Sequence, residues 1–351
     1  MEEKVTIIDV ANKAGVSKGT VDRVVHGRGE VSKKSTAKVL RAIEELGYQP
    51  NLHASLLASR NVNVIACLLP EFSEGEYWGM INQGFILGGE QVASLGVRTR
   101  AFYYNQYDEA SFKAACTDLL GSDPSAVLLP PLFMSDTVEF ASELHRRGIP
   151  YAYVDSKLEE DNYFVDYGMP MYSSGSLCAA LLTERCTREE VDEVAVIRIH
   201  RDKAGQSDPS VGRRTGFMDY MGSHFPKTVI HNVFINPAEP GNIYRTLDDF
   251  FRDHPAIRFV VTFNSRVYLV NNYLADHPVP GRRVIGFDNL EQNVRMLREG
   301  TLSIIITQHT ENQSKFAVIA LADWLLMRKR PEHRDNYMHM DILTRYNVDN
   351  Y

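Results

Sequence analysis

The sequence predicts an all-α headpiece followed by an α/β body made of two doubly wound parallel-sheet lobes. Residues 5–50 carry apolar side chains at helical spacing around a glycine turn, which predicts three short helices. From residue 62 onward, apolar runs of strand length alternate with amphipathic stretches, and this rhythm occurs twice. We place the boundaries at 1–50 for the headpiece, 51–61 for a hinge or linker and 62–351 for the body.

The first two predicted helices are short and meet at Gly15. Thr6 is placed to cap the first helix, and Asp9, three residues on, completes an approximate capping box. Ser17 is placed to cap the second helix, which turns Val21 inward. The residues that face outward on this helix are Lys18, Gly19, Asp22 and Arg23. Exposed long cations beside a glycine can enter a DNA major groove closely, although a helical hairpin with a solvated charged face has the same pattern.

A third predicted helix is capped by Ser32 and ends at Gly47. Its predicted apolar face consists of Val39, Leu40, Ile43 and Leu46. Three helices with a glycine turn between the first two make a compact helix-turn-helix headpiece.

These stretches resemble the DNA-binding signature of the LacI/GalR repressor family. The matching motifs are Thr6-Ile-Ile-Asp-Val-Ala, Ala14-Gly-Val-Ser, Thr20-Val-Asp-Arg-Val, Val31-Ser and Leu46-Gly-Tyr-Gln-Pro-Asn51. The resemblance implies that Lys18 and Arg23 touch base edges, with Gly19 allowing close approach. The phosphate contacts that it implies are Thr6, Ser17, Thr20, Ser32 and Asn51. Asp22 departs from the family pattern, which has serine here, and we expect its carboxylate to hold Arg23 or Lys18 in place.

Residues 51–59 follow a helix stop at Pro50 and carry Ala54 and Leu57 at helical spacing. A segment this short is marginal as a free helix, so it should form only when its apolar side is buried. In the resembled family this segment is a hinge helix that orders on DNA. Leu57 then occupies the position of the leucine that wedges into the minor groove. A plain linker helix is the alternative.

The body begins with a strand at 62–69 and a helix at 77–95. The further predicted strands are Val97–Tyr104, Ala126–Leu129, Tyr151–Val154, Glu193–Ile199, Val229–Ile235, Phe259–Phe263 and Val284–Phe287. Ligands of open parallel sheets bind beyond the carboxyl ends of the strands, so the residues that follow each strand are the candidate ligand contacts.

Aromatic and planar polar side chains occupy these positions. The candidate ligand contacts are Phe72, Tyr77, Trp78, Asp155, Arg213, Asn264, Asp288 and Gln308. Sugars suit this combination, because their C–H faces stack on rings while their hydroxyls pair with carboxylates, amides and guanidinium groups. Each residue alone could equally be a cap or a packing residue. Arg266, near the predicted cleft, would suit an acidic sugar or could simply be solvated.

These positions resemble the sugar-binding core of the type I periplasmic-binding-protein fold, which forms the body of the same repressor family. Within that resemblance, Arg213 in its R-x-x-G-F pattern aligns with the arginine that grips ligand hydroxyls. The remaining polar positions match other ligand contacts of the family. At Asn264 the chain continues Ser265-Arg266, where the family has Asn-Asp.

Charge is distributed unevenly along the chain. The formal net charge is −7, yet residues 1–60 carry 10 Lys and Arg against 7 Asp and Glu, while the remainder carries 28 against 38. A basic head on an acidic body is the asymmetry expected when only the head touches phosphates. The four cysteines are scattered, which predicts free thiols in a reducing cytoplasm rather than a zinc site.

The sequence predicts a ligand-controlled transcription factor, taken as a repressor, rather than an enzyme. Phosphate-loop, G-x-G-x-x-G, G-x-S-x-G and metal-ligand patterns are missing from the sequence, so we expect neither cofactor nor metal. The polar start Met1-Glu-Glu-Lys predicts no signal peptide, which argues against an exported solute-binding protein. The expected partners are operator DNA, a sugar, sugar acid or sugar phosphate, and a second copy of the chain in a homodimer; no membrane is expected.

Overall fold

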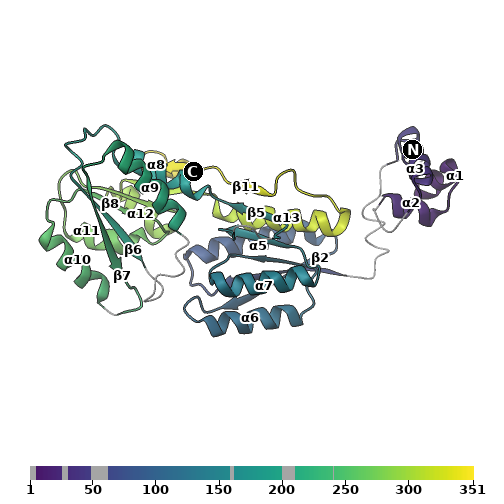
Figure 1. Cartoon of the computed structure of the whole chain (residues 1–351), viewed down its shortest axis with the longest axis horizontal. Coiled ribbons are helices and arrows are strands. Elements are labelled where there is room, and N and C mark those ends of the chain that lie inside the picture. The colour runs from purple at the N-terminus through teal and green to yellow at the C-terminus, as the bar shows by residue number, and fades with distance from the viewer. Residues whose placement is uncertain (1–4, 26–30, 49–61, 159–161, 200–209, 240) are drawn as a thin grey trace.

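The computed structural model describes residues 5–25, 31–48, 62–158, 162–199, 210–239 and 241–351 (Figure 1). These residues form a helical headpiece and two α/β lobes, as the sequence predicts. Among the described helices, none combines the length and the apolar character that a bilayer crossing requires.

The headpiece contains α1 (Ile7–Ala14), α2 (Lys18–Val25) and α3 (Lys33–Leu46). A complete capping box between Thr6 and Asp9 starts α1, as predicted. Gly15 ends α1 with a φ of 64°, a left-handed conformation that glycine adopts without a steric cost. The three helices meet at a core whose fully buried members are Val10, Val21 and Val39.

The predicted apolar face of α3 is wrong at one position. Leu40 is 55% exposed, whereas Ala42 is buried. Val39, Ala42 and Ile43 follow the i, i+3, i+4 spacing of a single helical stripe, and Leu40 lies one residue, or about 100°, beyond that stripe.

The first lobe is a parallel sheet with the strand order β11-β5-β4-β3-β1-β2. Its strands are β1 (Asn63–Pro70), β2 (Val97–Tyr104), β3 (Ala126–Leu129), β4 (Tyr151–Asp155), β5 (Val165–Gly168) and β11 (Asp335–Tyr337). Its helices are α5 (Tyr77–Ala93), α6 (Glu109–Gly121), α7 (Met134–Arg146) and α13 (Thr310–Met327). The near-continuous burial of β1 is typical of a central parallel strand covered on both faces.

The second lobe has the strand order β12-β10-β9-β8-β6-β7, with β12 antiparallel to β10 and the other pairs parallel. Its strands are β6 (Glu193–Ile199), β7 (Val229–Ile235), β8 (Phe259–Thr262), β9 (Arg283–Phe287), β10 (Ile304–Thr307) and β12 (Asp341–Leu343). Its helices are α8 (Met171–Leu182), α9 (Val211–His224), α10 (Asn242–Asp253), α11 (Val267–Asp276) and α12 (Glu291–Glu299), with a 3-10 turn at Val348–Asn350.

The chain passes between the lobes at the β5–α8, β10–α13 and β11–β12 connections. Each lobe is therefore built from separated stretches of sequence, and α13 returns to the first lobe to pack along α5 (Figure 1). The sequence does not predict β5, β11 and β12, because these strands are short and each contains an aspartate, whereas the equally short β3 is a wholly apolar run.

Two glycines allow α8 and α9 to approach closely. A Cβ on Gly175 of α8 would lie 1.8 Å from the Arg213 carbonyl oxygen, and one on Gly216 of α9 would lie 2.0 Å from the Tyr172 carbonyl oxygen. The helices touch through their backbones, and this contact positions the turn of α9 that carries Arg213. Gly222, also on α9, makes no such close contact, because a Cβ there would meet nothing within 4 Å.

We expect Gly216→Ala to lower the free energy of unfolding by about 1–3 kcal/mol, because the added methyl group forces α8 and α9 apart. Gly222→Ala is the matched control and should raise stability by up to about 1 kcal/mol, since alanine favours the helix. Urea unfolding followed by circular dichroism measures both. Equal effects of the two substitutions would contradict the close helix contact.

Candidate functional site

One face of α2 presents its basic side chains to solvent. Lys18, Gly19 and Arg23 are all exposed, while Val21 on the other face is fully buried. The Arg23 Nε donates a hydrogen bond of 3.1 Å to the Gly19 carbonyl oxygen, which holds the guanidinium along the helix. Asp22 is half-buried near Tyr48. The pKa of the Tyr48 hydroxyl is raised mainly because that side chain is partly buried, and secondly by the negative charge of Asp22.

The hydroxyls predicted to contact phosphate lie at helix starts. Thr6 and Ser32 cap α1 and α3, and the Ser17 Oγ accepts a 3.2 Å hydrogen bond from the Thr20 backbone N–H at the start of α2. Helix starts present free backbone N–H groups and a partial positive charge, both of which favour phosphate. Asn51, Ala54 and Leu57 lie outside the described residues.

In the body, Asp155 ends β4 and Asp288 follows β9, and both adopt left-handed backbone conformations. Asp155 has a φ of 69° and Asp288 a φ of 65°, backbone angles that residues other than glycine seldom adopt. The Asp155 backbone N–H donates 2.9 Å to the Oε1 of Gln313, and the Nδ2 of Asn293 donates 2.9 Å to the Asp288 carbonyl oxygen. Buried amide side chains therefore hold both strained turns.

A chain of hydrogen bonds runs between these two carboxylates. The Tyr77 hydroxyl donates 2.5 Å to Asp155 Oδ1, and the Gln308 Nε2 donates 3.1 Å to that hydroxyl. The same Nε2 lies 2.9 Å from Asp288 Oδ1, while the Arg213 Nη2 donates 3.4 Å to Gln308 Oε1. Tyr77 and Asp155 belong to the first lobe and Arg213 and Asp288 to the second, so the network crosses between them.

Arg213 is 5% exposed and held on several sides. Its Nη1 donates 2.8 Å to the Phe263 carbonyl oxygen, and its guanidinium carbon lies 4.3 Å from the centre of the Phe287 ring. Its Nε is buried and has no hydrogen-bond partner, so the guanidinium keeps a donor for a further acceptor.

Burial alters the acidity of the network. It raises the pKa of Asp288 to about 6, against the opposing effects of the Arg213 charge and the Gln308 hydrogen bond. Burial, reinforced by the Asp155 charge, raises the pKa of the Tyr77 hydroxyl well above its ordinary value. At neutral pH, Tyr77 is therefore a hydrogen-bond donor, and Asp288 is mainly ionised beside the Arg213 guanidinium.

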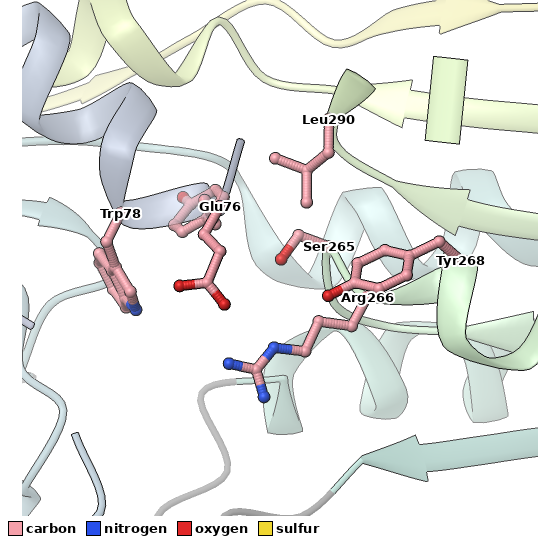
Figure 2. A pocket seen from close by; sticks show the side chains of 7 residues that line it. Glu76, Trp78, Ser265, Arg266, Tyr268 and Leu290 are labelled. Carbon is pink, nitrogen blue, oxygen red and sulfur yellow. The ribbon is translucent and has the colours of Figure 1, made fainter. Parts of the chain in front are cut away.

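A small pocket beside this network is lined by both lobes (Figure 2). Its lining residues are Glu76, Tyr77, Trp78, Ser265, Arg266, Tyr268 and Leu290. Across its mouth, the Arg266 Nη1 donates 3.1 Å to the Tyr107 hydroxyl of the first lobe. Aromatic rings, a carboxylate and a guanidinium thus face one space, a combination that can hold a polyhydroxylated molecule.

The structure brings five of the eight predicted ligand contacts into one network: Tyr77, Asp155, Arg213, Asp288 and Gln308. Trp78 is 3% exposed and lines the pocket. The other two make different contacts. The Phe72 ring packs edge-on against Tyr103, and the Asn264 Oδ1 accepts a 3.0 Å hydrogen bond from the Arg266 backbone N–H.

Sequence reasoning misses Gln313 and Asn293, which hold the two aspartate turns. Each lies in a polar stretch at the start of its helix, and residues in such stretches ordinarily face solvent. Both are fully buried here. No signal in the sequence separates them from solvated side chains.

Two family models match this chain. One, described as a periplasmic binding protein domain, matches residues 65–328, and the other, described as bacterial regulatory proteins of the lacI family, matches residues 6–51. The chain belongs to the LacI family. The predicted family and fold class are thereby confirmed.

Individual relatives agree with this LacI-family assignment. The HTH-type transcriptional regulator DegA of Bacillus subtilis is 43% identical over 74 residues, 21% of this chain and 22% of the relative. Catabolite control protein A of Priestia megaterium is 30% identical over 168 residues, 46% of this chain and 48% of the relative. The matches thus span about a fifth to a half of these curated relatives. Both are regulatory proteins, in line with the prediction that the chain is not an enzyme.

A solved structure extends the likeness over the whole body. A crystal structure from Bacteroides fragilis, ascribed to a LacI transcriptional regulator, is 32% identical to this LacI-family chain with a TM-score of 0.79. The match covers 83% of this chain and 100% of that one.

The raised pKa of Asp288 predicts a pH dependence of stability in the ligand-free LacI-family protein. The folded state binds this proton more tightly than the unfolded state, so Asp288 lowers stability as pH rises from about 4 to about 6. Asp288→Asn removes this titration. The variant should therefore gain on the order of 2–3 kcal/mol relative to wild type between pH 4 and pH 7. Urea unfolding at each pH measures the difference, and parallel curves would contradict the prediction.

Proposed function

We propose that this chain is a transcriptional repressor that binds operator DNA through its headpiece and a sugar or sugar derivative between its lobes. The observation that carries the proposal is the buried network from Arg213 through Gln308 to both aspartates, in a chain that also carries the exposed basic face of α2. The buried network can sense a small molecule, and the basic face of α2 can enter a major groove.

For DNA binding, α2 is the element that reads bases. Lys18 and Arg23 are its exposed cations, and the absence of a side chain at Gly19 lets the backbone approach the groove. Thr6, Ser17, Thr20, Ser32 and Asn51 contact phosphates and set the register. The Asp22 charge acts on Tyr48, just after α3, and Asp22 is not assigned a phosphate contact. In a homodimer, two such helices read half-sites about one helical turn apart, and the 51–61 hinge places Ala54 and Leu57 in the minor groove.

For ligand binding, the network supplies acceptors and donors at fixed positions. Asp155 and Asp288 accept from sugar hydroxyls, and the free Nε–H of Arg213 donates to one. The Trp78 and Tyr268 rings border the same space and can stack on the apolar face of a sugar ring. Arg266 at the pocket lining adds a charge that suits a sugar acid or sugar phosphate.

The network also supplies a route for coupling. Gln308 links Tyr77 of the first lobe to Asp288 of the second, so a ligand that displaces these hydrogen bonds changes what holds the lobes together. A ligand with different affinities for two lobe arrangements shifts the balance between them, with a coupling of typically about 1–3 kcal/mol. Through the hinge, that shift alters operator affinity. This assignment implies action in the cytoplasm, where the DNA is.

Arg23→Ala should weaken binding to the preferred operator by about 10- to 100-fold, because a lost bidentate base contact costs about 1–3 kcal/mol. Binding to random DNA should change far less. Fluorescence anisotropy with a sequence selected from a random library, and with an unrelated duplex, measures both affinities. Lys38→Ala, which removes an exposed cation of α3, is the matched control. Equal losses on both duplexes would rule out base reading by Arg23.

Arg213→Ala should abolish the response of operator binding to ligand while ligand-free DNA affinity stays within about twofold, because only the cleft loses its guanidinium. A thermal-shift screen of sugars, sugar acids and sugar phosphates first identifies the ligand. Arg266→Ala then tests the charge of that ligand: it should weaken anionic ligands selectively. An Arg213→Ala protein that still responds normally would mean that the ligand binds elsewhere.

A further inference from the structure

A second polar cluster lies on the second lobe, at the opposite end of the sheet from the cleft. Glu193 is the first residue of β6, His231 lies near the start of β7, and His254 follows α10, before β8. The cleft residues follow the carboxyl ends of these parallel strands, so this cluster at their amino ends is a separate place on the molecule (Figure 1).

The two imidazoles converge on a single carboxylate oxygen. The His231 Nε2 lies 2.8 Å and the His254 Nδ1 2.9 Å from Glu193 Oε2. The two rings are 4.2 Å apart, and the Phe250 ring packs against both, at 5.6 and 4.9 Å between ring centres. The three ligand atoms all lie within 4.8 Å of one another. One phenylalanine therefore holds both histidines toward the same point.

We propose that Glu193, His231 and His254 form a binding site for a divalent transition-metal ion, with zinc as the ion that the donors suit best. Two imidazole nitrogens and a carboxylate oxygen match the preference of Zn²⁺, whereas Ca²⁺ and Mg²⁺ prefer all-oxygen sites. In a tetrahedral site with bonds of about 2.0–2.1 Å, ligand atoms lie about 3.3 Å apart. The two nitrogen–oxygen distances, 2.8 and 2.9 Å, are about 0.5 Å shorter than this, and the two nitrogens lie within 4.8 Å of each other, so small side-chain movements would bring the three atoms to these separations. The fourth position is left for water.

The surroundings favour a cation and allow it to enter. All three side chains are partly exposed, between 21% and 40%. A pocket beside them is lined by Glu190, Asp192 and Asp253 as well as by Glu193 and His254. Arg258 also lines that pocket and is its one basic residue other than the histidine, so acidic groups dominate. The lining of this pocket therefore carries more acidic than basic groups, which favours a cation.

The site joins residues that lie far apart in the sequence. Its ligands are 38 and 61 residues away from Glu193 along the chain, and they come from β6, β7 and the loop after α10. A bound ion would fasten this end of the second lobe and stabilise it, because ions that bind only the folded state raise its stability. This inference does not rest on the proposed DNA or sugar binding.

The test is titration calorimetry of the full chain with ZnCl₂ alone, in a Cys186→Ser background that removes the cysteine that is not buried. We expect one ion per chain and a rise in the thermal midpoint on zinc addition. His231→Ala and His254→Ala should each weaken zinc affinity about tenfold or more, and the double variant should abolish it. The visible spectrum of bound Co²⁺ should show tetrahedral coordination that the double variant lacks.

His277→Ala is the matched control, since this histidine lies on the same lobe and stacks on Tyr273 instead. It should leave zinc affinity unchanged. Glu193→Gln keeps the side-chain shape and should weaken zinc binding without loss of fold, as judged by circular dichroism. Absence of zinc binding in the parent protein would overturn the proposal. So would zinc binding that is unaffected by the double variant, or affected equally by His277→Ala.

Discussion

The buried amide of Gln308 links the two lobes through hydrogen bonds to both. It is fully buried, receives a hydrogen bond from Arg213 and donates to Asp288 and to the Tyr77 hydroxyl. A buried polar group left without a partner costs about 1–3 kcal/mol, so these side chains stabilise one another only when the lobes hold them together. The same network that joins the two lobes contains the donors and acceptors that we propose for a ligand.

The candidate ligand site lies where strands of the two sheets end, and left-handed backbone conformations orient two of its side chains. Asp155 and Asp288 project from strand ends with positive φ, and buried amides of α13 and α12 hold those turns. Gly175 and Gly216 let α8 and α9 touch, and this contact positions Arg213 in the hydrogen-bond network that joins the lobes. Strained turns, a raised carboxyl pKa and a guanidinium with a free donor all lie within one small region. Strained backbone and perturbed acidity of this kind cluster at functional sites, which supports the proposed ligand site.

Much of this could be predicted from the printed sequence. The predicted strands Val97–Tyr104, Glu193–Ile199 and Val229–Ile235 coincide with β2, β6 and β7. The central strand β6 is largely buried, whereas β2 and β7 lie at sheet edges and keep polar residues at exposed positions. The rule that ligands bind beyond strand ends predicts Asp155, Asp288 and Gln308 as candidate ligand contacts. The same rule also selects Asn264, whose side chain in the structure accepts a hydrogen bond from the backbone of its own loop. A strand-end position is visible in sequence, whereas the direction of the side chain depends on the loop that follows.

The sequence by itself determined the order of elements, the three-helix headpiece and the family, since these follow from local periodicity, caps and short motifs. Only the tertiary structure decided which polar residues meet. Gln313 and Asn293 are buried because their helices pack over the aspartate turns, and Leu40 is exposed because it lies just outside the stripe that faces α1. Glu193, His231 and His254 show no metal-ligand spacing, yet parallel pairing of β6 with its neighbours brings them together. Contacts between residues distant in sequence arise from sheet topology and packing, and local patterns do not encode them.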